Sequence, residues 1–282
     1  MMKVGIKMNV IITPEKLAQW MKEKSDLIII DVRGKNQDFD SGKAAYEASH
    51  IPRAIFLDVK EDVTGDTAFL PDLETFAEKL GSLGIDEKSK IVLYDEGNHR
   101  SASKVWVALH ALGHVRAYIL NGGFKTWINN DYETSTTIER KSATNYKANI
   151  QLDKVMTIND VKQNLQDDAI TLIDSRGYER FSGKKEPKYK KAGHIPGAVN
   201  FEMKQTLNQD GTIKEQTVLQ EHFREIPTDE KIVVSCGSGN SACVNIVALK
   251  EAGYENVALY AGGFSEWIED DDNEVATEKS SK

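Results

Sequence analysis

The chain is poor in cysteine, in clustered histidine and in long apolar runs, and each shortage excludes a class of protein. Its 282 residues include only two cysteines, Cys236 and Cys243, which excludes a disulfide framework and a Cys-rich structural zinc site. No apolar run approaches the length of a membrane span. Acidic residues outnumber basic ones by 44 to 36, which argues against a general nucleic-acid-binding role. We therefore expect no metal, cofactor, nucleic acid or membrane among its partners.

The remaining composition is typical of a soluble globular protein, with 40% hydrophobic and 28% charged residues. The length is sufficient for two ordinary domains. Residues 1–10 lack the long apolar core of a secretory signal, so we expect a cytoplasmic location. The acidic stretch 269–274 predicts a solvated tail.

The sequence contains an internal repeat, in which four motifs of the first half recur at offsets of 143, 144, 141 and 140 residues. The pairs are Asp31-Val-Arg33-Gly34 with Asp174-Ser-Arg176-Gly177, His50-Ile-Pro52 with His194-Ile-Pro196, Ile91–Asp95 with Ile232–Cys236, and Asn121–Trp127 with Ala261–Trp267. We therefore expect two copies of one domain, at residues 1–135 and 153–282. Residues 136–152, which are rich in Ser, Thr, Lys and Asn, form the expected linker.

Each copy alternates short β-rich runs with helical patterns. In the second copy the predicted helix covers residues 242–252, and the predicted strands are 169–173, 198–201, 232–235 and 257–260. Alternation of buried strands with helices predicts a parallel sheet covered by helices on both faces. Ligands of such sheets bind beyond the carboxyl ends of the strands, which is where Cys236 follows its strand.

The segment Ser235–Ala242 places a cysteine in a Gly-rich turn before a helix. Gly237 and Gly239 let the backbone curl, so that several N–H groups point at one atom. The helix N-terminus adds positive partial charge there. Since such a cradle stabilises the thiolate, which is the nucleophilic form of cysteine, we predict that Cys236 is a nucleophile. The alternative is that Cys236 is a small buried apolar residue.

With these motifs the chain resembles the tandem-domain rhodaneses, the sulfurtransferases that include thiosulfate and 3-mercaptopyruvate sulfurtransferases. The most specific shared elements are the six-residue loop from Cys236, Asp174-Ser-Arg176 followed by Arg180-Phe181, Gly193–Gly197, and the Gly-Gly-Phe-x-x-Trp motif. The resemblance implies an α/β fold of two tandem rhodanese-like domains, each a parallel sheet flanked by helices. It also implies that an anionic donor gives its outer sulfur to Cys236 as a persulfide. The acceptor stays open among cyanide, a thiol and a carrier protein.

The repeat separates shared scaffold from residues of one copy. Asp95 takes the place of Cys236, and Gln37 takes the place of Arg180, so the first domain is expected to be catalytically silent. A carboxylate in that cradle would be hydrogen-bonded and inert as a sulfur carrier. The joint absence suggests that Arg180 serves the same chemistry as Cys236. The resemblance implies that the matching arginine binds the donor, which suits a guanidinium and a sulfonate or carboxylate.

Other candidates are assigned by the same comparison. Arg176 has a counterpart, Arg33, so we interpret it first as structural, paired with Asp174, and second as a donor-binding residue. The loop residues expected to contact the donor are Gly237, Ser238, Gly239, Asn240 and Ser241. His50 and His194 occur in both copies and are assigned to turn structure, Trp127 and Trp267 to core packing, and Cys243, with Ala102 as its counterpart, to a small buried position.

Two other functions and two donors remain open. A cysteine-dependent phosphatase would need a cationic clamp, but this loop ends Asn240-Ser241-Ala242. A non-catalytic binding or regulatory module would fit the first copy better than the second. Thiosulfate loops of the family carry cations just after the cysteine, whereas Gly237 and Ser238 look more like mercaptopyruvate enzymes. In some mercaptopyruvate enzymes the loop serine, here Ser238, joins a His and an Asp of the first domain. Asp58 lies in a suitable segment, but residues 67–69 supply no His. The basic run 184–191 is either a solvated loop or an attractor of anions.

Overall fold

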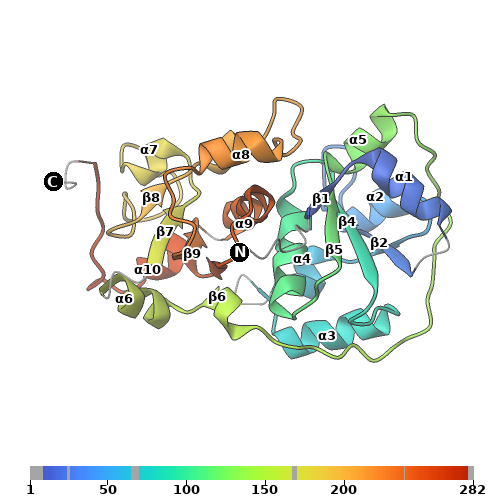
Figure 1. Ribbon diagram of the computed structural model, residues 1–282, viewed down its shortest axis with the longest axis horizontal. Coiled ribbons are helices and arrows are strands. Elements are labelled where there is room, and N and C mark those ends of the chain that lie inside the picture. Colours follow the sequence, from blue (N-terminus) through green and yellow to red (C-terminus); the bar gives the residue numbers. More distant parts are fainter. Residues whose placement is uncertain (1–8, 24–25, 65–69, 167–169, 238, 279–282) are drawn as a thin grey trace, which may run out of the picture. The chain divides into compact units, whose positions relative to one another are not determined.

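The computed structural model describes residues 9–23, 26–64, 70–166, 170–237 and 239–278. The chain divides into two compact units. The first contains the residues up to Gln151 together with Gln209–Ile213, and the second contains Leu152–Asn208 and the residues from Lys214 onward. Each unit is built around a five-stranded parallel sheet with helices on both faces, which confirms the predicted α/β fold (Figure 1).

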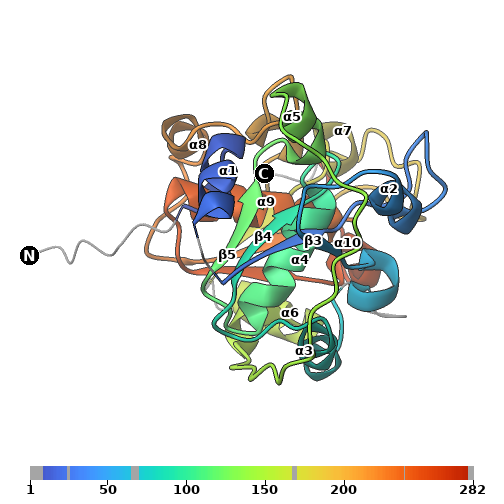
Figure 2. The same cartoon turned by 90° about the vertical axis from the view of Figure 1, so that its right-hand side faces the viewer.

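The first unit has the strand order β1-β5-β4-β2-β3. Its strands are β1 (Ile11–Ile12), β2 (Leu27–Asp31), β3 (Ala54–Phe56), β4 (Lys90–Tyr94) and β5 (Ala117–Leu120). Its helices are α1 (Pro14–Lys22), α2 (Gly42–Ala48), the π-helical turn η1 (Val59–Val63), α3 (Leu73–Ser82), α4 (Arg100–Ala111) and α5 (Gly123–Asn129). Helix α4 runs beside β4 and β5, as Figure 2 shows.

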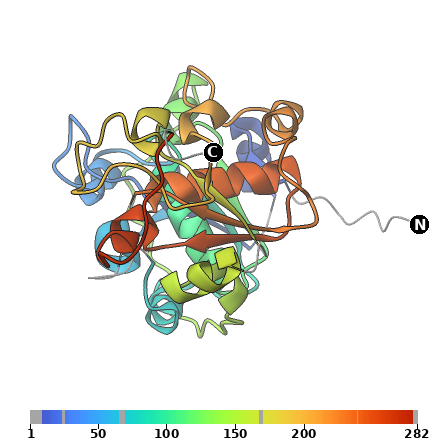
Figure 3. The same cartoon turned by 90° about the vertical axis from the view of Figure 1, so that its left-hand side faces the viewer.

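The second unit repeats this order as β6-β10-β9-β7-β8. Its strands are β6 (Val155–Met156), β7 (Ile170–Asp174), β8 (Val199–Asn200), β9 (Lys231–Ser235) and β10 (Val257–Tyr260). Its helices are η2 (Leu152–Lys154), α6 (Ile158–Gln166), α7 (Tyr178–Phe181), η3 (Met203–Thr206), α8 (Gln216–His222), α9 (Asn240–Ala252) and α10 (Gly263–Trp267). Figure 3 shows α9 beside the strands of this sheet. The predicted strands and the predicted helix are confirmed, although α9 begins two residues earlier; residue 169 lies outside the described residues.

The two central strands of each sheet set the position of the candidate site. Strand β2 pairs with β4 so that Asp31 lies opposite Tyr94, and β7 pairs with β9 so that Asp174 lies opposite Ser235. The middle residues of β2 and β9 are apolar and buried, as expected for strands that helices cover on both faces. Their carboxyl ends therefore meet at one edge, with an aspartate ending one strand and the candidate loop following the next.

The duplicated tryptophans anchor equivalent turns in both units. Trp127 and Trp267 are buried, and each indole N–H donates a 2.8 Å hydrogen bond to a backbone carbonyl, that of Glu133 and that of Glu274. This confirms their predicted core role. The expectation of a solvated segment at 269–274 is confirmed for five of its six residues, but the segment is a turn rather than a tail, and Asn273 within it is buried. The indole of Trp267 needs that turn as its hydrogen-bond acceptor.

The duplicated histidines close equivalent backbone bridges. His50 exchanges two backbone hydrogen bonds with Ser135, and His194 does so with Ala276. Each ring is also stacked on an aromatic neighbour, that of His194 on Phe181 at 3.8 Å between centroids. Burial lowers the pKa of His194, which keeps this ring neutral at pH 7. These contacts support the assignment of both histidines to turn structure.

Much of the segment expected as a linker lies against the first unit. The backbone N–H of Thr144 donates to Gly81 at 2.8 Å, and that of Gln151 donates to Ala111 at 2.7 Å. The segment therefore extends the first unit as ordered chain up to the start of the second. Among the described residues, no helix has both the length and the apolar character that crossing a membrane requires.

Candidate active site

Cys236 lies between the central strand β9 and helix α9, and only 4% of the cysteine is exposed to solvent. Its Sγ accepts a hydrogen bond from the backbone N–H of Gly239 at 2.9 Å. Gly239 has φ 87°, in the left-handed region that favours glycine, and it is the N-cap of the thirteen-residue helix α9. The Gly239 N–H and the helix N-terminus therefore both favour negative charge on Sγ.

The Gly-Gly-Phe motif of the second unit, residues 262–264, makes backbone contacts with the cysteine loop. The backbone N–H of Phe264 donates to the Cys236 carbonyl at 2.8 Å, and that of Ser265 donates to Gly237 at 3.1 Å. A Cβ on Gly263, which has φ +58°, would lie 2.5 Å from the Cys236 carbonyl oxygen. This close approach requires glycine at position 263, where the backbone of the motif holds the cysteine loop in place.

Asp95 occupies the equivalent cradle of the first unit. Its carboxylate accepts backbone hydrogen bonds from Gly97 at 2.9 Å, His99 at 3.2 Å and Ala102 at 3.2 Å. The prediction of a hydrogen-bonded carboxylate is confirmed. The same cradle that receives a side-chain carboxylate here thus surrounds a thiol in the second unit.

The two loops differ by one residue in length. Four residues separate Asp95 from the start of α4 at Arg100, and three separate Cys236 from the start of α9 at Asn240. Cys243 is therefore the fourth residue of its helix, as Ser103 is, and the earlier match of Cys243 to Ala102 is wrong. The extra loop residue shifts the register.

Arg176 and Asp174 form the ion pair that the sequence predicts. The Nε atom donates to Oδ1 at 3.1 Å and to Oδ2 at 3.0 Å, and Nη2 donates to Oδ2 at 2.6 Å. Nη2 also donates to the Gly193 carbonyl at 2.6 Å, and Phe264 lies under the guanidinium at 4.0 Å. These contacts hold the Arg176 guanidinium against Asp174 at the carboxyl end of β7.

Arg33 makes the equivalent aspartate, backbone-carbonyl and phenylalanine contacts in the first unit. It pairs with Asp31, donates to the Ser49 carbonyl at 2.6 Å and lies 4.0 Å over Phe124. Since both units keep this arrangement, the Asp–Arg pair behaves as shared scaffold.

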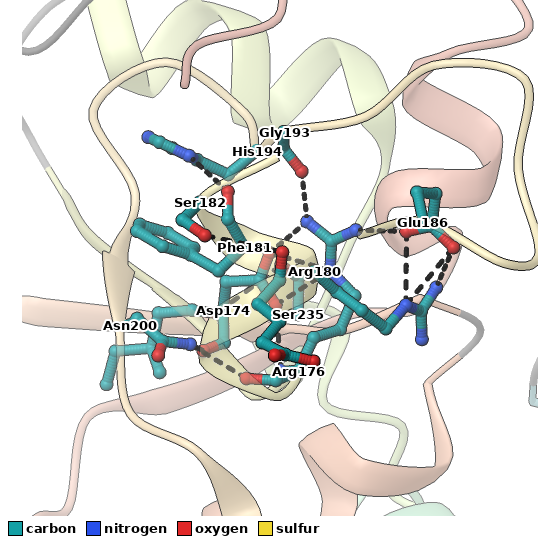
Figure 4. Close-up of polar contacts among 12 residues, drawn as sticks. Asp174, Arg176, Arg180, Phe181, Ser182, Glu186, Gly193, His194, Asn200 and Ser235 are labelled. Carbon is teal, nitrogen blue, oxygen red and sulfur yellow. Dashed lines mark hydrogen bonds and ion pairs between the residues drawn. The ribbon is translucent and has the colours of Figure 1, made fainter. Parts of the chain in front are cut away.

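Arg180 lies on α7 and faces Glu186 (Figure 4). Its Nε atom donates to the two carboxylate oxygens at 3.2 and 3.1 Å, and Nη2 donates to Oε1 at 2.9 Å. The Arg180 side chain is 21% exposed, whereas that of Glu186 is 2% exposed. The side of the guanidinium that carries Nε is thus occupied by protein. Nη1 makes no hydrogen bond within the part of the chain that is described.

Sequence reasoning missed Glu186 because it stands within the basic run 184–191. Its Oε2 also lies 3.3 Å from Nη1 of Arg176, so one buried carboxylate bridges both arginines. The only signal was a single acid among five lysines. That pattern says nothing about which way the side chain points.

Tyr189 connects Arg180 to the cysteine loop. The guanidinium carbon of Arg180 lies 5.2 Å from the ring centroid of Tyr189. A Cβ built on Gly237 would lie 2.7 Å from the Tyr189 hydroxyl oxygen. The arginine cluster and the cysteine loop therefore contact the same aromatic ring. Of the other predicted loop residues, Asn240 is exposed, Ser241 is half-buried, and Ser238 lies outside the described residues.

Three of the five lysines of the basic run face acidic partners. Lys184 lies 2.9 Å from Glu278, while Lys190 and Lys191 lie 3.7 and 3.2 Å from Asp271. These exposed pairs add little to stability, but they offset the positive charge that the run would present to an anion. Asp58 caps its own turn, accepting from the backbone of Lys60 and Glu61. The described residues contain no group of three or more His, Cys, Asp or Glu side chains arranged to hold a metal.

Comparison with known proteins covers both units. The sequence matches the family described as "Rhodanese-like domain" over residues 13–130 and again over residues 157–270. It is 33% identical over 263 residues to 3-mercaptopyruvate sulfurtransferase of Escherichia coli strain K12, spanning 89% of this chain and 93% of that protein. It is 31% identical over 252 residues to thiosulfate sulfurtransferase of Cricetulus griseus, spanning 86% of this chain and 85% of that one. Among solved structures, SseA from Escherichia coli matches with a TM-score of 0.78 and 29% identity, over 91% of this chain and 99% of that chain.

Proposed function

Because the chain belongs to the rhodanese-like domain family, with one copy of the domain in each unit, we propose that it is a sulfurtransferase. It moves a sulfane sulfur from a small anionic donor, thiosulfate or 3-mercaptopyruvate, to a thiophilic acceptor. Cys236 carries the sulfur as a persulfide, and the first unit is catalytically silent. The cytoplasmic location expected from the sequence stays a prediction.

One observation carries the proposal: Sγ of Cys236 accepts the Gly239 N–H at 2.9 Å, where Asp95 stands in the other copy. Backbone donors at a helix N-terminus stabilise a thiolate before reaction. They also stabilise the terminal sulfur anion of a persulfide, which carries the same charge one atom further out.

The chemistry follows from a thiolate and an anion-binding arginine. With thiosulfate, the Cys236 thiolate attacks the outer sulfur, the S–S bond breaks, and sulfite leaves with the electron pair. With 3-mercaptopyruvate, the C–S bond breaks, and the leaving carbon takes the proton of the donor thiol to give pyruvate. Attack on the outer persulfide sulfur by cyanide or by a thiolate then gives thiocyanate or a new persulfide, and the Cys236 thiolate is restored. We assign donor binding to Arg180 and the loop backbone, and scaffold to Arg176.

The test is intact-protein mass spectrometry after incubation with each donor. We expect a gain of one sulfur atom that maps to Cys236 and disappears when cyanide is added. Cys236→Ser, which is nearly isosteric, should show neither the gain nor turnover, while Cys243→Ser, the matched control on α9, should retain both. Substantial turnover by folded Cys236→Ser, or absence of any mass gain in the unmodified protein, would refute the proposal.

A further inference from the structure

Two arginines of the second unit share one buried carboxylate, that of Glu186. Its Oε1 accepts from Nη2 of Arg180 at 2.9 Å, and its Oε2 lies 3.3 Å from Nη1 of Arg176. Arg176 is already paired with Asp174 at 2.6 Å. The four side chains carry two positive and two negative charges, so the cluster in Figure 4 is neutral as a whole.

Glu186 leaves one end of Arg180 available to a ligand. A guanidinium has five N–H donors, and Glu186 takes the one on Nε and one on Nη2. Three remain, two on Nη1 and one on Nη2, and together they can bind a second carboxylate or sulfonate end-on. The ring of Tyr189 packs against the same guanidinium at 5.2 Å. Held by a carboxylate and by a ring, the remaining end keeps one orientation.

The charge of Glu186 acts differently on different donors. Thiosulfate carries two negative charges, whereas 3-mercaptopyruvate carries one carboxylate and a thiol. The energy between a donor and a fixed charge is proportional to the charge of the donor. A buried carboxylate next to Arg180 therefore weakens the attraction of a dianion about twice as much as that of a monoanion. The side chain is 2% exposed, so solvent screens this effect less than it would at the surface.

We propose that Glu186 is a positioning and specificity-determining residue. It orients Arg180 for the donor and, by cancelling the arginine charge, favours singly charged sulfur donors over doubly charged ones. The inference rests on the proposed sulfurtransferase function and on the donor-binding role given to Arg180. Nothing in the sequence motifs assigned this carboxylate a role.

The test compares kcat/KM for thiosulfate and for 3-mercaptopyruvate at low and high salt. Glu186→Gln keeps the side-chain shape and removes the charge, so the thiosulfate-to-mercaptopyruvate ratio should rise roughly 10-fold, and the thiosulfate rate should fall more steeply with salt. Glu186→Asp keeps the charge but is one methylene shorter. We expect the wild-type ratio there, with a KM several-fold higher for both donors because Arg180 is held less well.

Glu179→Gln is the matched control. Glu179 lies on α7 one residue before Arg180 and is exposed, and its carboxylate forms no ion pair or hydrogen bond within the described chain. The control removes the same charge close by, and its ratio should stay at the wild-type value.

Circular dichroism establishes that each variant is folded. An unchanged ratio in folded Glu186→Gln, or an equal rise in Glu179→Gln, overturns the charge effect. If Glu186→Gln does not fold, Glu186→Asp carries the test: an unchanged KM, or a shifted donor ratio, overturns the inference. Failure of the wild-type protein to take sulfur from either donor is a different result, because it refutes the proposed function itself.

Discussion

Arg176→Gln should destabilise the second unit much more than it impairs the chemistry of sulfur transfer. The side chains of Arg176 and Asp174 are 2% and 3% exposed, so the pair is shielded from solvent. Removing one partner of a buried ion pair leaves the other charge uncompensated, which costs about 3–5 kcal/mol. At roughly 3–4 °C per kcal/mol for a unit of this size, its Tm should fall by roughly 10–20 °C.

Arg33→Gln in the first unit is the matched comparison. Asp31 would retain a hydrogen bond from the Tyr94 hydroxyl, which lies 2.7 Å from its carboxylate. In the second unit Ser235 takes the place of Tyr94, and its hydroxyl donates to a backbone carbonyl instead. Since a hydrogen bond to a charged group contributes about 1.5–3 kcal/mol, the loss in the first unit should be smaller by that amount.

Scanning calorimetry measures both losses, and hydrogen exchange of β2 and β7 assigns each transition to its unit. Arg180→Gln provides the contrast, because Arg180 is partly exposed and Glu186 would still be paired with Arg176. We expect a smaller change in Tm there and a loss in kcat/KM of roughly 10- to 150-fold with either donor, from about 1.5–3 kcal/mol of lost anion contact. If Arg176→Gln keeps its Tm and loses kcat/KM while Arg180→Gln does the reverse, the two roles are exchanged.

Three further outcomes follow from the structure. Asp95→Cys in a Cys236→Ser background should stay inactive in donor kinetics, because the first cradle has no arginine in the place of Arg180; near-native turnover would contradict this. Gly237→Ala should lower kcat/KM, since its Cβ meets the Tyr189 hydroxyl, and adding Tyr189→Phe should restore part of the loss; equal activity of the single and double variants would argue against that contact. Burial lowers the pKa of His114 from 6.5, so the folded state binds fewer protons than the unfolded one; urea titrations should show stability falling as pH drops below 6.5, and less so in His114→Gln.

The repeat, the strands and the asymmetry of the two cradles could all be predicted from the sequence. These signals are local or duplicated. The Asp174–Arg176 pair, for example, joins residues two apart at the end of a strand, and the same two residue types recur at Asp31 and Arg33. A strand end fixes the geometry of such neighbours, so their pairing could be predicted without knowledge of the rest of the chain.

Only the tertiary structure decided what surrounds Arg180. Glu186 and Tyr189 belong to a loop that also contains five lysines. The loop has no hydrophobic periodicity, so its sequence does not indicate which side chains are buried. In the folded protein the loop buries the Glu186 carboxylate against two arginines and brings the Tyr189 side chain close to Gly237. These contacts form because desolvation and packing across the whole fold favour them. Neither effect can be predicted from which residues are neighbours in the sequence.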